Sequence, residues 1–297
     1  MFLNSSIFPS KTDIDFSKSK KEPKAKLNIN KWIISELNTV SKLIEKNIND
    51  YRFDEAARNI YQFVWHSYCD WYVELSKTIL NSKEKSSISE VKQTLSYVFK
   101  QILILLHPFI PFITEELWLK NKLDKPKNYL MFANWSNKKA NKDKQIKEVE
   151  NIINLISQLR AFKNELNVSP GSFVDMSIST LSKNDQLFIK KNQTVLKKLG
   201  RINSFLDTDK DKASANLVIK GDIFKIYFDQ SIDLSLIKEN LLKRQQKYQS
   251  ELDGISKRLS NKSFVERAPK NIVDQEKNNY SNLKKDIDKI SITIKGL

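Results

Sequence analysis

One short stretch of the sequence places groups capable of acid–base chemistry close together. Residues 106–118 read LHPFIPFITEELW, with His107 before two prolines and with Glu115 and Glu116 after them. A histidine within reach of a carboxylate can act as the general base of a hydrolase. This cluster is therefore the first candidate for a catalytic site.

The same stretch also suits a corner between two helices. Pro108 lacks a backbone N–H and would end one helix near His107, whereas Pro111 fits the first turn of the next helix. In such a corner the histidine packs and does not catalyse. No neighbouring nucleophile or metal-ligand cluster in the sequence supports the catalytic alternative.

Residue types that build known catalytic sites are scarce in the rest of the sequence. It has two histidines, one cysteine and five glycines, and it contains no CxxC, HExxH, GxGxxG, GxSxG or P-loop motif. Zinc sites need clustered cysteine and histidine, and phosphate-binding loops need closely spaced glycines. We therefore expect no catalytic residue, no metal site and no cofactor in this chain.

The net charge is the strongest global signal. Lysine and arginine number 51 against 35 acidic residues, giving a formal net charge of +16 and a pI of about 9.6. A polyanion, above all a nucleic acid, is the partner that such a surplus favours. The alternative is a lysine-rich composition inherited from an AT-rich genome. One cysteine, with no signal peptide and no long apolar run, favours the cytoplasm.

Apolar periodicity predicts a mainly α protein with an antiparallel helical bundle at 27–135, after a lead-in at 1–26. Ser87 and Glu90 form a capping-box pair that would begin the third helix of this bundle. The apolar faces of the three helices comprise Ile33, Leu37, Val40, Ile44 and Ile48; Ala57, Ile60, Val64, Tyr68, Trp71, Leu75 and Ile79; and Ile88, Val91, Leu95, Val98, Ile102 and Leu105.

A basic linker at 136–146 precedes a region at 147–232 that mixes helix and strand. Its first helix carries an apolar stripe and stops at the turn sequence NVSPG. The alternating FVDMSIST predicts a strand, and a helix follows from Ser182 with Gly200 just past its end. A hairpin then turns around Gly221. The region is expected to hold a small β-α-β-β module.

The tail at 233–297 is predicted to be an antiparallel helical hairpin. Apolar residues repeat at three- and four-residue spacing on both sides of an interruption, SNKSFVERAPKN, which is typical of a coiled-coil seam. From Leu234 onward there are 14 Lys or Arg and 8 Asp or Glu, a net charge of +6. A rod of this kind can reach, clamp or dimerise, but it has no cavity for a small ligand.

Five blocks of the sequence are informative together: NKWIISELN (30–38), YRFDEAARNIYQFVWHSYCDWYVELSK (51–77), LLHPFIPFITEELW (105–118), LRAFKNELNVSPG (159–171) and RLSNKSFVERAPKNIVDQEK (258–277). They resemble class I valyl-tRNA synthetases, and the resemblance extends over residues 27–297. The first four are similar to the anticodon-binding region and are partly shared with the leucyl and isoleucyl relatives. The fifth looks like the turn of the C-terminal coiled-coil arm and points to the valyl enzyme.

The resemblance implies that separate parts of the protein bind the tRNA and catalyse the reaction. The bundle would contact the anticodon stem-loop of tRNA-Val and the arm its outer corner, whereas ATP and Mg would belong to a catalytic domain with HIGH and KMSKS motifs. Neither motif is present: His66 lies in WHSY, His107 lies in LHPF, and DMSIS (175–179) lacks both lysines. We expect this chain to be non-catalytic alone, monomeric, and dependent on a catalytic part in a longer frame or on a separate polypeptide.

Ten residues are candidates for contacts with tRNA. Arg160 and Lys163 lie three residues apart and off the apolar stripe, so both are expected to face RNA, with Asn164 beside them. The family motif usually has arginine at both places, and a lysine at 163 lacks the planar fork. Arg52 and Arg58 flank a helix start and are phosphate contacts or surface ion pairs. The arm carries the other five candidates, which form either a phosphate-facing edge or a merely solvated face of the coiled coil. They are Lys243, Arg244, Lys247, Lys257 and Arg258.

Aromatic residues of the second helix could stack on unpaired bases, but their helical spacing favours core packing with one exposed exception. They are Trp65, Tyr68, Trp71 and Tyr72. Two other functions stay open from the sequence. One is a structural protein that dimerises through 233–297, and the other is a hydrolase that uses His107 with Glu115 or Glu116.

Overall fold

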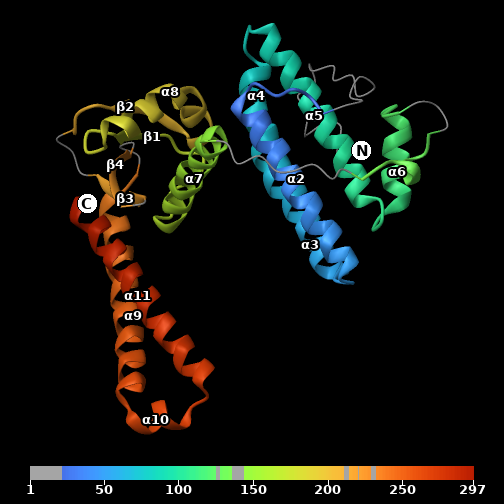
Figure 1. The fold of residues 1–297 in the computed structure, drawn as a ribbon. Coiled ribbons are helices and arrows are strands. Elements are labelled where there is room, and N and C mark those ends of the chain that lie inside the picture. Colours follow the sequence, from blue (N-terminus) through green and yellow to red (C-terminus); the bar gives the residue numbers. More distant parts are fainter. Residues whose placement is uncertain (1–21, 125–127, 136–143, 211–213, 220, 229–231) are drawn as a thin grey trace. The chain divides into compact units, whose positions relative to one another are not determined.

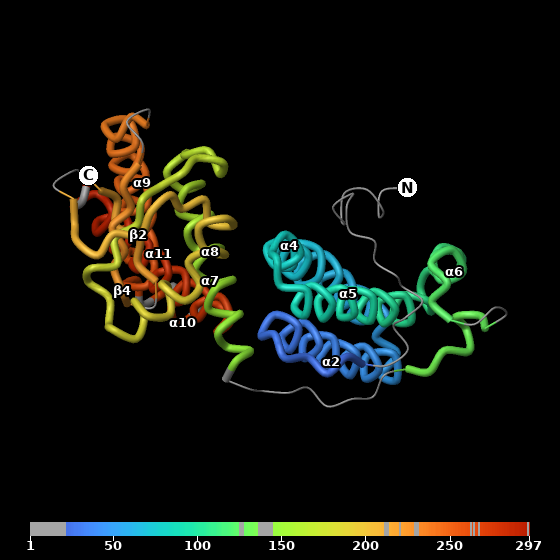
Figure 2. The backbone as a smooth tube through the Cα atoms, turned by 90° about the horizontal axis from the view of Figure 1, so that it is seen from above, coloured from blue at the N-terminus to red at the C-terminus, as the bar shows by residue number. Residues whose placement is uncertain are grey.

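The computed structural model describes residues 22–124, 128–135, 144–210, 214–219, 221–228 and 232–297. The described residues are mostly helical and include one small mixed sheet, which confirms the mainly α fold class (Figures 1 and 2). The chain divides into two compact units, Met1–Ile153 and Asn154–Leu297. None of the described helices has the length and apolar content that a membrane crossing requires.

The first unit is built on the predicted bundle. Its first long helix packs against a second helical stretch and against a third long helix, and the predicted Ile33, Leu37 and Leu95 are buried between them. The second stretch is helical without a break from Phe53 to Leu80, and its middle is wound as a π-helix. The elements are α2 (Asn28–Asn49), α3 (Phe53–Gln62), π-helical η2 (Phe63–Val73), α4 (Glu74–Leu80), α5 (Lys85–Leu106), α6 (Pro111–Lys120) and the 3₁₀ turn η3 (Leu130–Phe132).

The π-helical segment changes which residues face the core. Its hydrogen bonds run from residue i to i+5, so a turn holds more residues than an α-helical turn. Phe63 and Tyr68, five residues apart, are both buried, whereas the predicted Val64 is only partly buried. Ile60, before this segment, is buried as predicted. The prediction for Ala57 is wrong, because Ala57 is exposed and Ala56 is buried.

A carboxylate from the third helix holds the start of α2. Glu90 Oε1 accepts hydrogen bonds from the backbone N–H groups of Lys26 and Leu27 at 2.8 and 2.9 Å, and from Asn30 Nδ2 at 2.9 Å. The predicted capping box is wrong, since α5 begins at Lys85 and Glu90 lies within it. Glu90 instead satisfies orphan N–H groups at the positive end of a different helix.

The proline corner is confirmed. Helix α5 ends at Leu106, and Pro111 is the first residue of α6, where its missing N–H leaves no hydrogen bond unmade. The two helices are held by Trp118, which is buried and donates from Nε1 to the carbonyl oxygen of Asn128 at 2.9 Å. Trp118 shares a small core with Leu103, Ile104, Leu123 and Leu130.

The second unit contains the later part of α7 (Lys144–Glu165), a sheet and a helical hairpin. The sheet has the order β2-β1-β4-β3; β1 and β2 are parallel and joined by α8, and the other neighbours are antiparallel. Gly221 has a φ of 96° in the turn between the last two strands, which agrees with the predicted hairpin. The elements are β1 (Val174–Ser177), α8 (Lys183–Gly200), β2 (Ile202–Leu206), β3 (Ala215–Ile219) and β4 (Asp222–Phe228).

The predicted β-α-β-β module lacks one of these strands. Strand β2 has the sequence INSFL, and Ile202 is its buried residue, while Asn203 is exposed. A short edge strand without apolar alternation gives no period-two signal. Its pairing with β1 depends on the crossover through α8, which places Val174 opposite Ile202.

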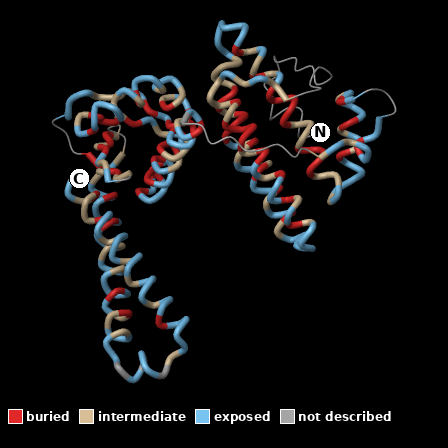
Figure 3. The backbone as a smooth tube through the Cα atoms, viewed as in Figure 1, coloured by how far each residue is buried: buried red, intermediate tan, exposed pale blue. Residues whose placement is uncertain are grey.

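The tail forms the predicted hairpin, α9 (Leu234–Ser260), α10 (Lys262–Arg267) and α11 (Lys270–Gly296). Figure 3 shows that burial along it is confined to a thin seam. Near its base, Asn216 of β3 donates from Nδ2 to the carbonyl oxygen of Ile292 at 3.1 Å, and Thr293 Oγ1 donates back to the carbonyl oxygen of Asn216 at 3.1 Å. The hairpin is therefore tied to the edge strand β3. The buried seam residues are Ile237, Leu241, Leu252, Ile255, Val273 and Ile290.

The Glu90 contact predicts a specific stability loss. Glu90→Ala removes the acceptor of three hydrogen bonds and is expected to lower the free energy of unfolding by about 1–3 kcal/mol in urea titrations. Glu90→Gln keeps a neutral acceptor and should lose less. The control is Glu116→Ala, which removes only an exposed pair with Lys120 and should cost about 0.5 kcal/mol or less. Equal losses for the two alanine variants would contradict the capping role.

Candidate nucleic-acid interface

Lys163 lies inside the second unit and not on its surface. Its side chain is 1 % exposed, and Nζ donates to the carbonyl oxygens of Ser172 at 2.8 Å and Gly200 at 3.2 Å. The expectation that Lys163 faces solvent is wrong. The last carbonyls of a helix have no partner within the helix and carry negative partial charge. The ammonium group satisfies one of them at the end of α8 and so joins α7 to α8.

Arg160 and Asn164 lie one turn apart on the exposed side of α7, as expected. The Arg160 Nη2 donates to the carbonyl oxygen of Leu199 at 3.0 Å, next to the carbonyl that Lys163 reaches. Two cations of α7 thus converge on the last turn of α8. Asn164 is exposed beside them and presents an amide that can donate and accept.

Several positive charges lie close together at the corner where α7 meets the end of α8. Burial, together with the positive charges of Arg160 and Arg201, lowers the pKa of Lys163 from 10.5 to about 8. Arg201 follows the end of α8 directly, so it adds a third cation to the two that α7 brings to this region. Sequence reasoning missed Arg201, although an arginine immediately after a glycine at a helix end was a usable signal.

The backbone at the end of α8 differs from the predicted one. Gly200 is the last helical residue, and Arg201, with φ of 53°, takes the left-handed conformation that was expected of glycine. A Cβ at Gly200 would lie 3.1 Å from Ile202 Cδ1 and 3.6 Å from Leu159 Cδ2. A side chain at Gly200 would thus press on the end of the Ile202 side chain, and Arg201, one residue later, takes the left-handed position.

The two arginines of the bundle share one carboxylate. Arg52 Nη2 lies 3.0 Å from Glu55 Oε1, and Arg58 Nη2 binds Glu55 Oε2. Both arginine side chains are about three-fifths exposed, at 60 and 62 %. They can therefore still reach a ligand, although the shared carboxylate offsets part of their charge. Their contact with RNA remains a prediction.

The aromatic cluster behaves as its spacing suggests. Tyr68, Trp71 and Tyr72 are buried, and the Tyr72 hydroxyl donates to Asn30 Oδ1 at 2.7 Å. Burial raises the pKa of Tyr72 well above its usual range. Trp65 is the exposed exception, and its ring stacks on that of Tyr61 at a centroid distance of 6.3 Å. The pair leaves aromatic faces open to solvent on the helix that carries Arg58.

The five candidate cations of the arm occupy one side of α9. At 100° per residue they fall within an arc of roughly 140°, next to the buried seam. Lys243 pairs with Glu239 at 2.6 Å, and Arg258 bonds Glu276 of α11 at 2.9 Å. Arg244 packs over the ring of Tyr248, 5.1 Å from its centroid. Lys247 and Lys257 are exposed. Phosphate contact by this side of the arm remains a prediction.

His107 is not paired with either glutamate. Its Nδ1 lies 2.9 Å from Thr114 Oγ1, and that hydroxyl also donates to the carbonyl oxygen of Ile110 at 2.9 Å. Glu115 accepts from the N–H of Leu130 at 3.1 Å, while Glu116 pairs with Lys120. The corner histidine is thus bonded within the fold, and the geometry does not support a hydrolase dyad.

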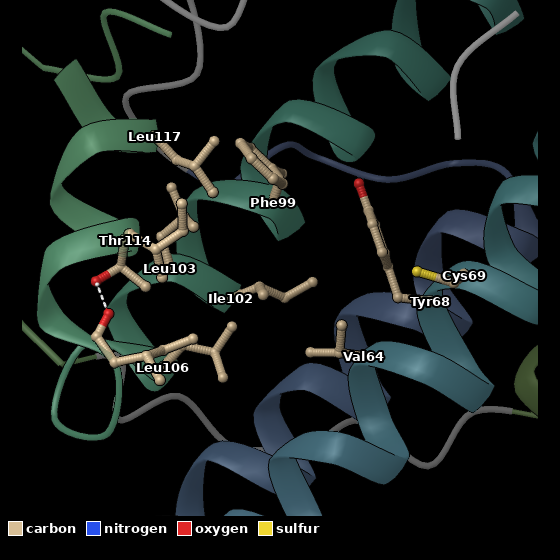
Figure 4. A pocket seen from close by; sticks show the side chains of 11 residues that line it. Val64, Tyr68, Cys69, Phe99, Ile102, Leu103, Leu106, Thr114 and Leu117 are labelled. Atoms are coloured by element: carbon tan, nitrogen blue, oxygen red, sulfur yellow. Dashed lines mark hydrogen bonds between the residues drawn. The ribbon is translucent and has the colours of Figure 1, made fainter. Parts of the chain in front are cut away.

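The cleft beside this corner is apolar. Figure 4 shows Leu103, Leu106 and Leu117 on one side of it and Val64 on the other, with Cys69 nearby. Burial raises the pKa of the Cys69 thiol to about 11, so a thiolate nucleophile is disfavoured at neutral pH. Among the described residues, no group of three or more His, Cys, Asp or Glu side chains is arranged to hold a metal ion.

Comparison with protein families defines the class of this chain. A family described as the anticodon-binding domain of tRNA ligase matches residues 30–178, from α2 to the residue after β1. The chain therefore contains the anticodon-binding domain of a tRNA ligase. A second family, the valyl tRNA synthetase tRNA binding arm, matches residues 233–297, which hold α9 to α11.

Similar proteins narrow the class. The chain is 59 % identical to the valine–tRNA ligase of Pelagibacter ubique over 99 % of its own length and 34 % of that protein. It is 34 % identical to the Ruegeria pomeroyi valine–tRNA ligase over 86 % of its length and 25 % of the relative. The chain belongs to the valyl-tRNA synthetase family, as the resemblance implied. It spans about a third or less of the length of these relatives.

The buried Lys163 predicts a loss of stability with a particular pH dependence. Lys163→Met leaves two carbonyl oxygens without this donor and should lower the free energy of unfolding by about 1–3 kcal/mol at pH 7. The folded-state pKa of about 8 lies below the ordinary 10.5, so the unfolded chain binds more protons between these values. The wild type should therefore gain stability relative to the variant as pH rises from 8 to 10.

Lys198→Met is the matched control for this measurement. Lys198 is exposed in the last turn of α8, the helix whose end Lys163 bonds, and its removal should change stability little at any pH. Urea unfolding of the three proteins at several pH values provides the comparison. A difference between wild type and Lys163→Met that stays constant over this range would rule out a lysine with a lowered pKa.

Proposed function

We propose that this chain binds tRNA-Val as the anticodon-binding and arm portion of a valine–tRNA ligase. Valine would be joined to the bound tRNA by a catalytic part outside these 297 residues, which would also hold ATP and Mg. The observation that carries the proposal is the pairing of an anticodon-binding domain with a valyl-type arm in one chain. Its relatives carry the name of that reaction.

The proposal divides the chain by task. Residues 27–135 would take the anticodon stem-loop, 147–232 would support the arm, and 233–297 would lean on the outer corner of the tRNA. The segments 1–26 and 136–146 would serve as lead-in and linker, except that α7 already begins at Lys144. Residues 1–21 and 136–143 lie outside the described residues. Folded RNA is held mainly through phosphates and 2′-hydroxyls, and unpaired loop bases stack on aromatic or guanidinium planes.

The charges and rings of the described residues support these tasks. Lys247 and Lys257 are exposed on the same side of α9, and Arg52 and Arg58 are exposed at the bundle. Trp65 lies near Arg58 on one helical stretch and adds an aromatic face. Lys163 acts from inside, because its buried ammonium group bonds the carbonyl oxygen of Gly200 at the end of α8.

We also propose that the chain is a cytoplasmic monomer working with a catalytic part in cis or as a separate half. The seam of the arm supports a monomer, because α9 packs against its own return helix α11. Ile237 and Leu252 are buried in that contact. A dimer through 233–297 would need this seam to open or a second apolar face. Sedimentation of the purified chain distinguishes the two states.

Binding of tRNA tests the proposal directly. Fluorescence anisotropy with a labelled tRNA-Val transcript should show tight binding at low salt, with log K falling linearly as log salt rises. The same preparation should not activate valine in an ATP–pyrophosphate exchange assay. Absence of binding to tRNA-Val at low salt would refute the proposal, and so would valine activation by the chain alone.

The arm contribution can be isolated by a triple substitution. Lys243→Gln with Lys247→Gln and Lys257→Gln removes three charges from one side of α9 and is expected to weaken binding at least about tenfold. The salt slope should fall by about 3, because each phosphate contact contributes close to 1. Circular dichroism should remain unchanged, since Lys247 and Lys257 are exposed and Lys243 pairs only within its own helix.

A matched triple on the return helix provides the control. Lys284→Gln with Lys285→Gln and Lys289→Gln changes the net charge by the same amount on α11, where no RNA-facing edge is proposed. This variant should retain most of the affinity and most of the slope. If both triples weakened binding equally, overall charge and not the α9 edge would account for the attraction.

A further inference from the structure

Arg201 occupies a backbone position that ordinarily belongs to glycine. Its φ of 53° is in the left-handed region, where an L side chain crowds its own backbone. Its carbonyl oxygen accepts from Val174 N at 3.1 Å, so the β1 pairing holds the strained residue in place. Tyr51, Lys122 and Asn167 share this left-handed φ, at 58°, 51° and 56°, so what sets Arg201 apart is its charge and its contacts. Glycine would fit here without strain, yet the chain carries an arginine.

The positive charge at this corner exceeds what the fold requires. The C-terminus of a helix carries only about half a negative charge. Arg160 and Lys163 already reach the carbonyl oxygens of Leu199 and Gly200. Arg201 brings a third cation, and α8 adds Lys197 and Lys198 in its last turn. Structural capping alone therefore leaves an outward-facing positive field.

The Arg201 side chain lies against an exposed ring. Its Cζ is 5.5 Å from the centroid of Phe173, which is 52 % exposed. A guanidinium group stacked in this way is held in orientation while its N–H edges stay available, and the guanidinium fork matches phosphate oxygens. Arg160 is exposed at the same corner.

We infer that Arg201, oriented by Phe173 and accompanied by Arg160, forms a contact site for the phosphodiester backbone of the bound tRNA. We call these three residues the corner site. This inference rests on the proposed function and deepens it, because it assigns RNA contact to the α7–α8 junction in addition to the bundle and the arm. Arg201 takes the RNA-facing role that the sequence had suggested for Lys163, and Lys163 supports the corner from inside.

The decisive variant is Arg201→Gly in the full chain. Glycine relieves the left-handed strain, so the melting temperature should stay the same or rise. Binding of a labelled tRNA-Val transcript, measured by anisotropy over a salt series, should weaken about five- to tenfold. The slope of log K against log salt should fall by about 1. Arg201→Asn, which also tolerates this backbone, should show the same loss.

Lys183→Gln is the matched control. Lys183 is an exposed lysine at the other end of α8, roughly 25 Å from the corner at 1.5 Å per residue, and its loss removes the same charge. Affinity should change less than twofold. Wild-type affinity in Arg201→Gly, or an equal loss in Lys183→Gln, would overturn the corner site while leaving tRNA binding by the wild type, and hence the proposed function, intact.

Competition with inorganic phosphate distinguishes a site for the RNA backbone from a site for a free anion. Inorganic phosphate added at constant ionic strength should not displace tRNA from the wild type, because one isolated phosphate lacks the neighbouring contacts of the RNA. Selective displacement from the wild type, absent in Arg201→Gly, would indicate a site for free phosphate and would also overturn the inference. Failure of the wild type to bind tRNA at all would instead refute the proposed function.

Discussion

The contact between the Lys163 ammonium group and the last carbonyl of α8 connects the parts of the second unit. Lys163 comes from α7, and its two acceptors belong to the turn before β1 and to the end of α8. Because β2 begins immediately after that end, the same contact sets the start of the parallel β1–β2 pair. A buried charge is tolerated only when it is well bonded, and here two carbonyl oxygens and a helix dipole provide the compensation.

The first unit uses the same principle with the opposite sign. Glu90 accepts hydrogen bonds from the unpaired backbone N–H groups where α2 begins, so a charged side chain of one helix caps the end of another. In both units the terminal groups that need a partner are far in sequence from the group that supplies it: Glu90 is 63 residues from Leu27, and Lys163 is 37 residues from Gly200. Helix ends thus serve as tertiary contacts, which fixes the helices against one another more firmly than local caps would.

This distance in sequence explains what could be predicted. Periodicity and turn chemistry are local, and they were sufficient for the bundle helices, the proline corner at Pro111, the N-cap at Ser182 and the hairpin of the arm. The burial of Lys163 was not predictable from its place off the apolar stripe, because the acceptors that bury it come from another helix and a turn.

The remaining differences also arise from tertiary context. The π-helical segment shifts the burial phase within a continuous helical run, and no residue type marks where it begins. Strand β2 pairs through Ile202 without alternation, and Arg201, not the glycine before it, takes the left-handed position after α8. At the candidate interface, the types of residue were predictable, but which cation faces outward was decided by contacts between elements.

The arm shows how the chain places charge at a distance from its core. A hairpin of two helices has no third layer to cover its seam, so Tyr280, Leu283 and Ile287 are only partly buried between Val273 and Ile290. Its stiffness must therefore come largely from the base, where Thr293 and Asn216 tie α11 to β3. Local stability follows the density of such contacts and decreases toward the tip. The cations of α9 are thus carried by a support that is anchored in the sheet, and Lys163 in turn holds α7 to the end of α8 and to the turn before β1.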